Sequence, residues 1–220
     1  ASAGGKRYPK AREELFAAFE KGALVFNYLG HGGEDGLSGE RVWEKSDGQN
    51  LNNRYKYPLF ITITCSFSRF DNLTRPTAGE YAYWNPKGGA ISMITTVRTI
   101  GQGQAEVFND KLAEHIFSYN TNNENSIAEN LRLAKNFSPS SATNVVFYLG
   151  DPALKLAMAN PKVVLTKVND IVITDAIPDF QSLAYMKISG EVQADNGSLM
   201  TTYNGELSIN IFDKEVTRAT

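Results

Sequence analysis

The sequence predicts an α/β domain with a mainly parallel sheet, followed by a shorter module made only of β-strands. In the first part, short and almost continuous apolar runs alternate with segments of helical periodicity, as in a sheet whose strands are buried on both faces. Near Pro161 the helical periodicity stops, and short alternating strands separated by turn residues take over. The predicted boundaries are therefore 1–160 for the α/β domain and 161–220 for the β module.

Apolar runs and helical patterns give the expected elements of the first domain. The expected strands are the apolar runs at 23–30, 57–65, 88–97 and 144–152. Helices are expected where apolar residues recur at three- and four-residue spacing, at 8–22, 104–119 and 126–137. Strands that alternate with helices in this way form layered domains in which helices cover a mostly parallel sheet.

The C-terminal segment has the pattern of a β-sandwich. Alternating strands are expected at 185–193 and 205–213, with turn signals at Asp195-Asn196-Gly197 and Asn204-Gly205. A complete immunoglobulin-like sandwich needs about 100 residues. The module is therefore expected to be partial.

Composition and charge narrow the possible classes of protein. Hydrophobic residues make up 42% and charged residues 21%, which is ordinary for a globular protein. The net charge of −2, with Lys and Arg scattered, argues against a nucleic-acid partner. No apolar stretch approaches the roughly 18 to 20 residues that span a bilayer, so no transmembrane segment is expected in this chain. The single cysteine excludes an intramolecular disulfide and a cysteine-rich zinc site.

Two chemically reactive side chains follow neighbouring apolar runs. His31, one of only two histidines, stands between glycines behind the first run, and Cys65 ends the second. The carboxyl ends of parallel strands meet at one sheet edge, so these side chains can share a cleft if their strands are adjacent and parallel. The alternatives are a simple glycine-rich turn at His31 and an inert, buried thiol at Cys65.

As a catalytic pair, these two side chains would perform acyl transfer. The Cys65 thiolate would attack a carbonyl carbon, and His31 would supply or relay a proton to the leaving amine. The N–H of Gly32, which no side chain obstructs, and the N–H of Cys65 would bind the developing oxyanion. No metal and no cofactor are expected, and the substrate-binding residues are not assigned from the sequence.

Charged residues near these two positions have two interpretations each. Arg98, behind the third run, either contacts an acidic group of a substrate through its two nitrogens or is a solvated charge at a strand end. Glu34, Asp35 and Glu40 either bind calcium or solvate their loop. Solvation is the favoured interpretation in both cases.

The remaining conspicuous side chains are expected to be structural. His115 is expected at the surface or at a boundary and makes no metal pair with His31. Trp43, Trp84 and Tyr81 are expected to pack, with Trp84 or Tyr81 lining the cleft as the alternative.

Several ordered blocks resemble the gingipain-type family of cysteine peptidases. "NYLGHGGEDGLSGE" is followed by "ITITCSFSRFDNLTRPTAGEYAYWNPKGGAISMITTVRTI" and then by "YLGDPALKL". That family has a caspase-like fold with a Gly-His-Gly turn after one strand and a cysteine that ends the next. Its further blocks match Phe70-Asp71, the segment 79–90 and Gly150-Asp151-Pro152. The resemblance covers residues 20–158.

The resemblance implies a cysteine endopeptidase with Cys65 as the nucleophile and His31 as the catalytic histidine, acting mostly on the leaving group. It implies that the family's first strands and helices, with part of the P1 pocket and an acidic partner of the histidine, precede position 1. It also implies that residues 161–220 begin an immunoglobulin-like module.

Within the family, the pattern is most similar to the sortase-like branch that serves the type IX secretion system of Bacteroidetes. The resemblance then implies that the substrates are secreted cargo proteins whose C-terminal signals are processed. It implies outer-membrane secretion components as partners, and a secreted or cell-surface location associated with the outer membrane. Two alternatives stay open: an inactive peptidase-like scaffold that binds partners in a secretion or adhesion assembly, and a cysteine hydrolase acting on a small amide.

Overall fold

The computed structural model describes residues 8–118, 125–137, 141–158, 161–173, 184–194 and 196–205, together with 207 and 209. The chain divides into two compact units, Ala1–Met158 and Ala159–Thr220.

A four-stranded sheet forms the centre of the first unit, in the order β1-β5-β6-β7. Strands β1 (Val25–Leu29), β5 (Leu59–Ile63) and β6 (Ser92–Thr96) run parallel, and β7 (Val146–Leu149) runs antiparallel to β6. All four strands lie inside the predicted runs, and the mainly parallel sheet confirms the predicted fold class. Every residue of β5 and β6 is buried, as expected for strands covered on both faces.

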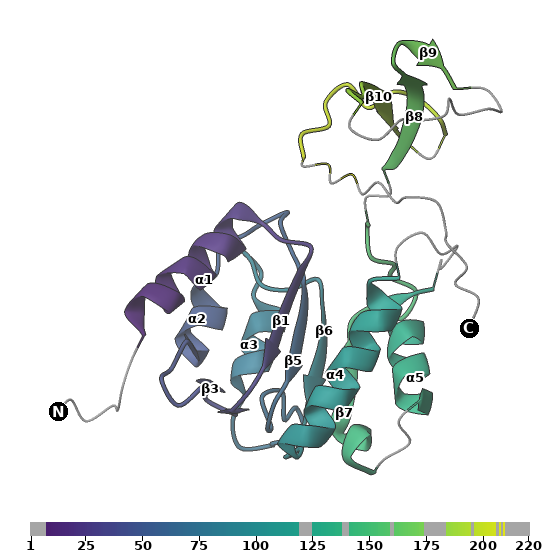
Figure 1. The fold of residues 1–220 in the computed structure, drawn as a ribbon. Coiled ribbons are helices and arrows are strands. Elements are labelled where there is room, and N and C mark those ends of the chain that lie inside the picture. Colours follow the sequence, from purple (N-terminus) through teal and green to yellow (C-terminus); the bar gives the residue numbers. More distant parts are fainter. Residues whose placement is uncertain are drawn as a thin grey trace. The chain divides into compact units, whose positions relative to one another are not determined.

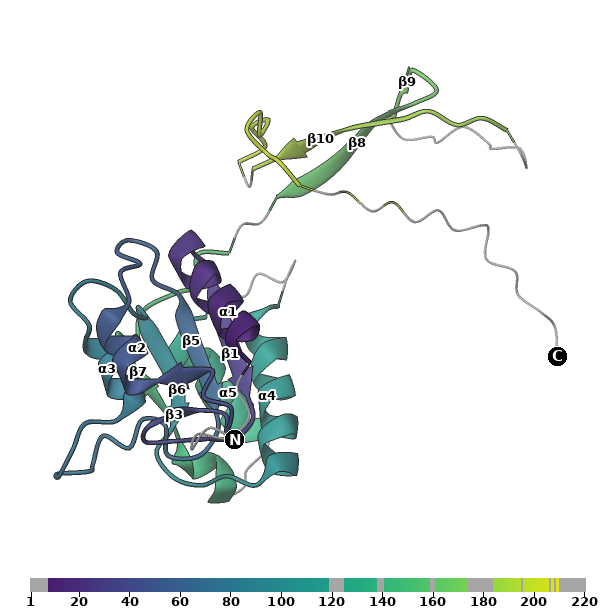
Figure 2. The same ribbon diagram turned by 90° about the vertical axis from the view of Figure 1, so that its left-hand side faces the viewer.

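Helices cover both faces of this sheet (Figure 1). On one face lie α1 (Pro9–Lys21), α2 (Lys45–Asn50) and α3 (Ala78–Trp84). On the other face lie α4 (Gln102–Ile116) and α5 (Ile127–Phe137), with the 3₁₀ helix η1 (Ser141–Val145) leading into β7. Figure 2 shows the same layers after a quarter turn. The helices expected at 8–22, 104–119 and 126–137 are confirmed, whereas α2 was not predicted.

Two apolar clusters join these layers. The cluster under α4 and α5 is mostly aliphatic, apart from Phe108. The cluster under α1 and α3 is aromatic: Phe19 stacks on Phe26 with ring centroids 3.8 Å apart, and the rings of Trp43 and Phe60 lie 5.2 Å apart. Trp43 is completely buried, which confirms its expected packing role. The sheet that carries the site is therefore supported from both sides.

A small antiparallel sheet follows β1 directly. It consists of β2 (Gly32–Gly33), β3 (Gly36–Leu37) and β4 (Trp43–Glu44). The sequence indicated only a glycine-rich loop here, because two-residue strands give no periodicity. This sheet fixes the backbone around the histidine turn.

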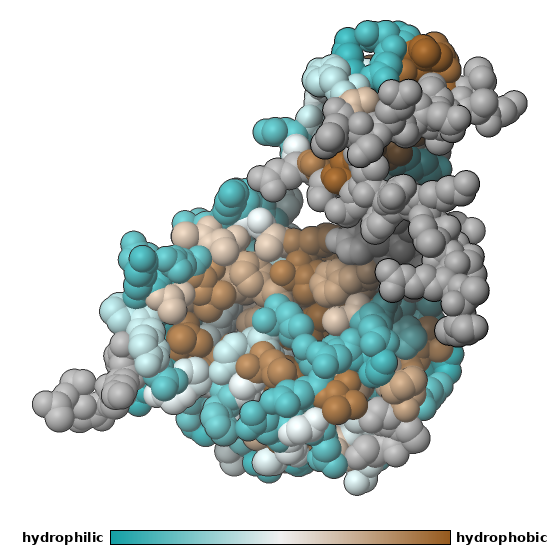
Figure 3. Space-filling view, in the orientation of Figure 1, coloured by the Kyte–Doolittle hydropathy of each residue, from teal (hydrophilic) through white to brown (hydrophobic). Residues whose placement is uncertain are grey.

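The surface of the first unit exposes apolar residues over β1, between α1 and α4, as Figure 3 shows. Leu24 and Leu29, in and beside this edge strand, are each 40% exposed. No helix in the described part of the chain is long and apolar enough to cross a membrane.

In the described residues of the second unit, three antiparallel strands form a sheet in the order β10-β8-β9. These are β8 (Lys162–Val168), β9 (Ile171–Val172) and β10 (Ile188–Gln193). Asp195 lies outside the described residues, and so does most of the strand expected at 205–213. The immunoglobulin-like identity of this unit stays a prediction.

Candidate active site

The strand register brings His31 and Cys65 to the same edge of the sheet. Strands β1 and β5 are adjacent and parallel, and Leu29 pairs with Ile63. His31 and Cys65 each follow their paired residue by two positions, so they leave neighbouring strands at the same level. His31 and Cys65 can share a cleft only if their strands are adjacent and parallel, and these strands are.

The His31 turn is held through its backbone. The His31 carbonyl accepts a hydrogen bond from the Tyr28 hydroxyl and another from the Ser38 N–H, both at 2.7 Å. Gly30, with φ of 157°, lies where a Cβ would come within 3.0 Å of the Tyr28 hydroxyl. The imidazole itself is exposed. The turn therefore presents a solvent-accessible histidine on a fixed backbone.

The N–H of Gly32 faces away from the hairpin. Gly32 pairs with Leu37 and Gly33 with Gly36 in the antiparallel ladder of β2 and β3. Hydrogen-bonded and non-hydrogen-bonded pairs alternate in such a ladder. The Ser38 N–H donates to the His31 carbonyl, so the pair His31–Ser38 is a hydrogen-bonded one. The next pair, Gly32–Leu37, is therefore a non-hydrogen-bonded one. The hairpin thus leaves the Gly32 N–H available for another acceptor.

Gly32 also lies against the residue that precedes Cys65. A Cβ at this position would be 2.5 Å from Thr64 Oγ1, 3.0 Å from Thr64 Cγ2 and 3.2 Å from Leu37 Cδ2. Real Cβ atoms do not approach other atoms as closely as 3.0 Å. Only glycine therefore lets the His31 turn approach the Cys65 turn this closely.

The chain turns sharply after Cys65. The thiol is half-buried, and its sulfur lies 4.0 Å from the Ile100 carbonyl oxygen. Ser66 adopts a left-handed conformation with φ of 51°. The Ser68 N–H then donates to the Thr96 carbonyl at 3.1 Å, which attaches this turn to the end of β6. Cys65 consequently projects from a turn that is fixed on both sides.

The first turn of α3 joins the two loops. The Ala78 N–H donates to the Glu34 carbonyl at 2.8 Å, and the Gly79 N–H donates to the Phe67 carbonyl at 3.0 Å. Thr77 and Glu80 form a capping box that fixes this helix start. The block resembling the peptidase family therefore connects the histidine hairpin to the cysteine loop.

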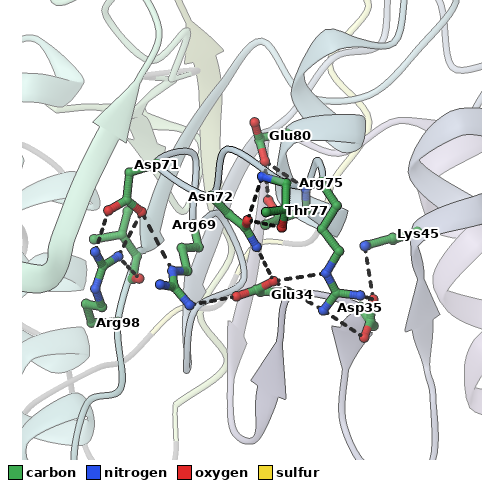
Figure 4. A network of polar contacts seen from close by, with 12 residues as sticks. Glu34, Asp35, Lys45, Arg69, Asp71, Asn72, Arg75, Thr77, Glu80 and Arg98 are labelled. Atoms are coloured by element: carbon green, nitrogen blue, oxygen red, sulfur yellow. Dashed lines mark hydrogen bonds and ion pairs between the residues drawn. The ribbon is translucent and has the colours of Figure 1, made fainter.

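A polar network reinforces this connection (Figure 4). The Glu34 carboxylate, whose side chain is 14% exposed, accepts hydrogen bonds from Arg69 at 3.1 Å, Asn72 at 2.8 Å and Arg75 at 3.3 Å. Burial alone would raise the pKa of Glu34, but these three donors outweigh it and hold the pKa below its usual value. Glu34 is thus an ionised clamp between the hairpin and the loop.

The other acidic residues of the hairpin pair with side chains of the protein itself. Asp35 pairs with Lys45 at 3.0 Å and with Arg75 at 3.1 Å, and the hydrogen bond from Lys45 is the main cause of its lowered pKa. Glu40 accepts a hydrogen bond from Ser38. Within the described residues, no group of three or more potential metal ligands comes together. The favoured interpretation of a merely solvated loop is wrong for Glu34, because Arg69 and Arg75 neutralise it.

Arg98 binds a carboxylate of the protein itself. Its two terminal nitrogens face Asp71, with Nη1 2.9 Å from Oδ1, and Nη1 also donates to the Val97 carbonyl at 2.7 Å. The hydrogen bond from Arg98 is the main cause that lowers the pKa of Asp71. Arg98 is exposed just beyond the end of β6, as expected of a charge at a strand end, and its pairing with the half-exposed Asp71 is a contact that the sequence did not indicate.

The other residues singled out in the sequence lie away from this edge or at the surface. His115 is partly buried on α4, at a boundary as expected. Trp84 is 61% exposed at the end of α3, so the prediction that it packs in the interior is wrong. Tyr81 is partly exposed on the same helix.

Sequence reasoning missed Tyr28, Thr64 and the role of Glu34. One signal for Tyr28 was present, because the tripeptide Tyr-Leu-Gly recurs at 148–150 and forms a similar turn. The partners of Glu34 lie 35 to 41 positions away, so one sequence gives no sign of them.

Comparisons with known proteins agree with this architecture. The model of peptidase family C25 matches residues 1–157. The crystal structure of the Arg-specific cysteine proteinase gingipain R (RgpB) is 17% identical, with a TM-score of 0.57, covering 73% of this chain and 39% of that chain. The complex of Porphyromonas gingivalis RgpB pro- and mature domains is 16% identical, with a TM-score of 0.58, covering 73% and 40%.

A further structure, described only as a protease, is 18% identical with a TM-score of 0.50, covering 84% of this chain and 50% of that chain. No protein of curated function has a similar sequence. The chain spans about two fifths of the gingipain chains, and at these identities the likeness shows a shared fold. The family model matches well over half of the chain, and the chain therefore belongs to peptidase family C25.

Proposed function

We propose that this chain carries the catalytic pair of a cysteine endopeptidase, with Cys65 as the nucleophile and His31 as the catalytic histidine. The observation that carries the proposal is the pairing of Leu29 with Ile63, beyond which both side chains leave the sheet together. Membership of peptidase family C25 supports the reaction class.

The alternation of side chains supports the pairing. A Cβ at Gly32 would point at Thr64, so along the extended chain the preceding His31 side chain points to the opposite side. Cys65 likewise follows Thr64 in the chain, and its sulfur lies near Ile100, which belongs to the cluster under α4 and α5. On this basis we propose that the imidazole and the thiol face the same side of the sheet edge.

The reaction is acyl transfer in two steps. The Cys65 sulfur bonds to the carbonyl carbon of the substrate, and the carbonyl electron pair moves to oxygen, where the N–H groups of Gly32 and Cys65 donate to it. The intermediate then expels the amine, which takes a proton from His31 and leaves an acyl-enzyme. Water or an amine subsequently attacks the acyl carbon, gives a proton to the now neutral His31 and releases the Cys65 thiolate.

The test uses the fact that Cys65 is the only cysteine in the chain. Wild type, Cys65→Ala and His31→Gln are treated with a panel of peptidyl acyloxymethylketones that differ in the P1 residue. We expect labelling of wild type, none of Cys65→Ala and slow labelling of His31→Gln. Equal labelling of wild type and Cys65→Ala contradicts the proposal and favours the inactive scaffold.

A finer assignment is to the sortase-like branch represented by PorU. The ordered blocks of residues 20–158 support it, from the Gly-His-Gly turn to Gly150-Asp151-Pro152. The proposed substrates are secreted cargo proteins, which are processed at the cell surface. Outer-membrane secretion components are the proposed partners. The second unit is proposed to begin an immunoglobulin-like module. Added amines should then divert the acyl-enzyme from water. A product ratio that does not respond to amine concentration argues for simple hydrolysis.

A further inference from the structure

One peptide group in the site accepts two hydrogen bonds at its carbonyl. The carbonyl of the His31–Gly32 peptide accepts hydrogen bonds from the Tyr28 hydroxyl and the Ser38 N–H, both at 2.7 Å. The N–H of that same peptide belongs to Gly32 and faces away from the hairpin. The two donors therefore fix the plane of the peptide whose N–H is proposed to meet the oxyanion.

The two hydrogen bonds also polarise this peptide. An amide whose carbonyl accepts hydrogen bonds becomes a stronger donor at its N–H, because chains of hydrogen bonds strengthen one another. Tyr28 is suited to remain a donor: it packs against the aromatic cluster, and burial, followed by the nearby Glu40 carboxylate, raises the pKa of its phenol. The phenol consequently keeps its proton at neutral pH.

We infer that Tyr28 is a positioning residue of the oxyanion site, fixing and polarising the His31–Gly32 peptide through its carbonyl. This inference rests on the proposed function, because it assigns a task to a residue that does not itself touch the reacting atoms.

The chain contains its own control for this inference. Tyr148, Leu149 and Gly150 repeat the turn: the Tyr148 hydroxyl donates to the Asp151 carbonyl at 2.9 Å, and a Cβ on Gly150 would lie 3.0 Å from that hydroxyl. The next residue is Pro152, so the corresponding peptide has no N–H to donate. Strand β7 is antiparallel to its neighbour, which places this second turn at the opposite edge of the sheet.

The experiment compares Tyr28→Phe with Tyr148→Phe in the 220-residue chain. Acylation of Cys65 by a small peptidyl p-nitrophenyl ester forms a carbon–sulfur bond, releases p-nitrophenolate and passes through an oxyanion. Alkylation of Cys65 by iodoacetamide displaces iodide and forms no oxyanion. Only the first reaction depends on the Gly32 N–H.

We expect Tyr28→Phe to slow acylation about three- to tenfold, the loss of one hydrogen bond, with alkylation unchanged. Tyr148→Phe should leave both rates unchanged. If Tyr28→Phe acylates as fast as wild type, or loses acylation and alkylation equally, the inference is wrong.

A second readout does not depend on catalysis. The amide proton of Gly32 should shift upfield in the NMR spectrum of Tyr28→Phe, since its peptide loses one of two acceptor bonds, and should stay in place in Tyr148→Phe. An unchanged Gly32 amide in Tyr28→Phe overturns the inference. The two proposals can fail separately. If the Gly32 amide shifts in Tyr28→Phe but wild type never forms an acyl-enzyme, the effect of Tyr28 on the His31–Gly32 peptide is supported and the proposed function is wrong.

Discussion

Replacing Gly32 by alanine is predicted to push the His31 turn away from the Cys65 turn. The new Cβ would lie 2.5 Å from Thr64 Oγ1, whereas ordinary contacts begin at 3.4 Å, so the two turns must separate by about 0.9 Å. Overpacking of this kind costs about 1–3 kcal/mol. Misplacing reacting groups by about 1 Å costs about 10²-fold in rate.

The assay is the rate of Cys65 acylation by the small p-nitrophenyl ester, measured beside the urea midpoint of unfolding. We expect Gly32→Ala to acylate about 10²-fold more slowly than wild type. Gly33→Ala is the matched control, because a Cβ there meets nothing within 4 Å. Its acylation rate should stay within about twofold of wild type.

A second substitution should reverse the effect. Thr64→Ala removes both Thr64 atoms that lie too close to the new Cβ. Among the residues that the structure describes, the buried Thr64 hydroxyl has no hydrogen-bond partner, so the substitution loses none of these bonds. In Gly32→Ala/Thr64→Ala, most of the lost acylation rate should return. If the double variant is as slow as Gly32→Ala, or if Gly33→Ala is equally slow, close approach of the two turns is not the reason for glycine at position 32.

Three further predictions concern ionic contacts. Glu34→Gln should lower the free energy of unfolding by about 1.5–3 kcal/mol and slow acylation, because Arg69 and Arg75 lose a charged acceptor. The control Glu129→Gln removes an exposed ion pair on α5 and should change neither the free energy of unfolding nor the acylation rate. Equal effects of the two substitutions would show that Glu34 is not a clamp. Because folding lowers the pKa of Glu34, ionised Glu34 stabilises the folded state at pH values above the usual pKa of 4.5. This stabilisation is lost as the pH falls through the lowered pKa. At pH values below about 4.5 the urea midpoint of unfolding should therefore decrease, and it should decrease less in Glu34→Gln than in wild type. Arg98→Ala should leave iodoacetamide alkylation of Cys65 within about twofold of wild type, since its ion pair is half exposed; a selective rise in KM for acidic substrates would instead show that Arg98 contacts substrate.

The sheet was predictable, and so was the position of His31 and Cys65 behind adjacent parallel strands, because both follow from local pattern. The run Leu59–Ile63 is apolar except for Thr62, as expected where both faces of a strand are covered, and parallel neighbours end at one edge. The antiparallel direction of β7 was not predictable, since a run of four residues carries no information about direction.

The details that assemble the site depend on contacts between distant residues. Glu34 and Arg75 are hydrogen-bonded although they lie 41 positions apart in the sequence. Gly32 lies against Thr64 only because the sheet places the His31 turn beside the Cys65 turn. Neither contact changes the periodicity of its own segment. Asp71 is a further example. The sequence matched Phe70-Asp71 to a block of the family, but only the fold shows that Arg98 is the partner of Asp71.

The central claim is that Cys65 and His31 act together on a carbonyl group. The most direct measurement is mass-spectrometric mapping of the acyl group after a peptidyl p-nitroanilide, whose leaving amine needs a proton from His31, reacts with wild type, Cys65→Ala and His31→Gln. The account predicts one acyl group on Cys65 in wild type, none in Cys65→Ala, and formation slowed by about 10²- to 10⁴-fold in His31→Gln. Acyl groups that appear equally in Cys65→Ala, or an unchanged rate in His31→Gln, would contradict it.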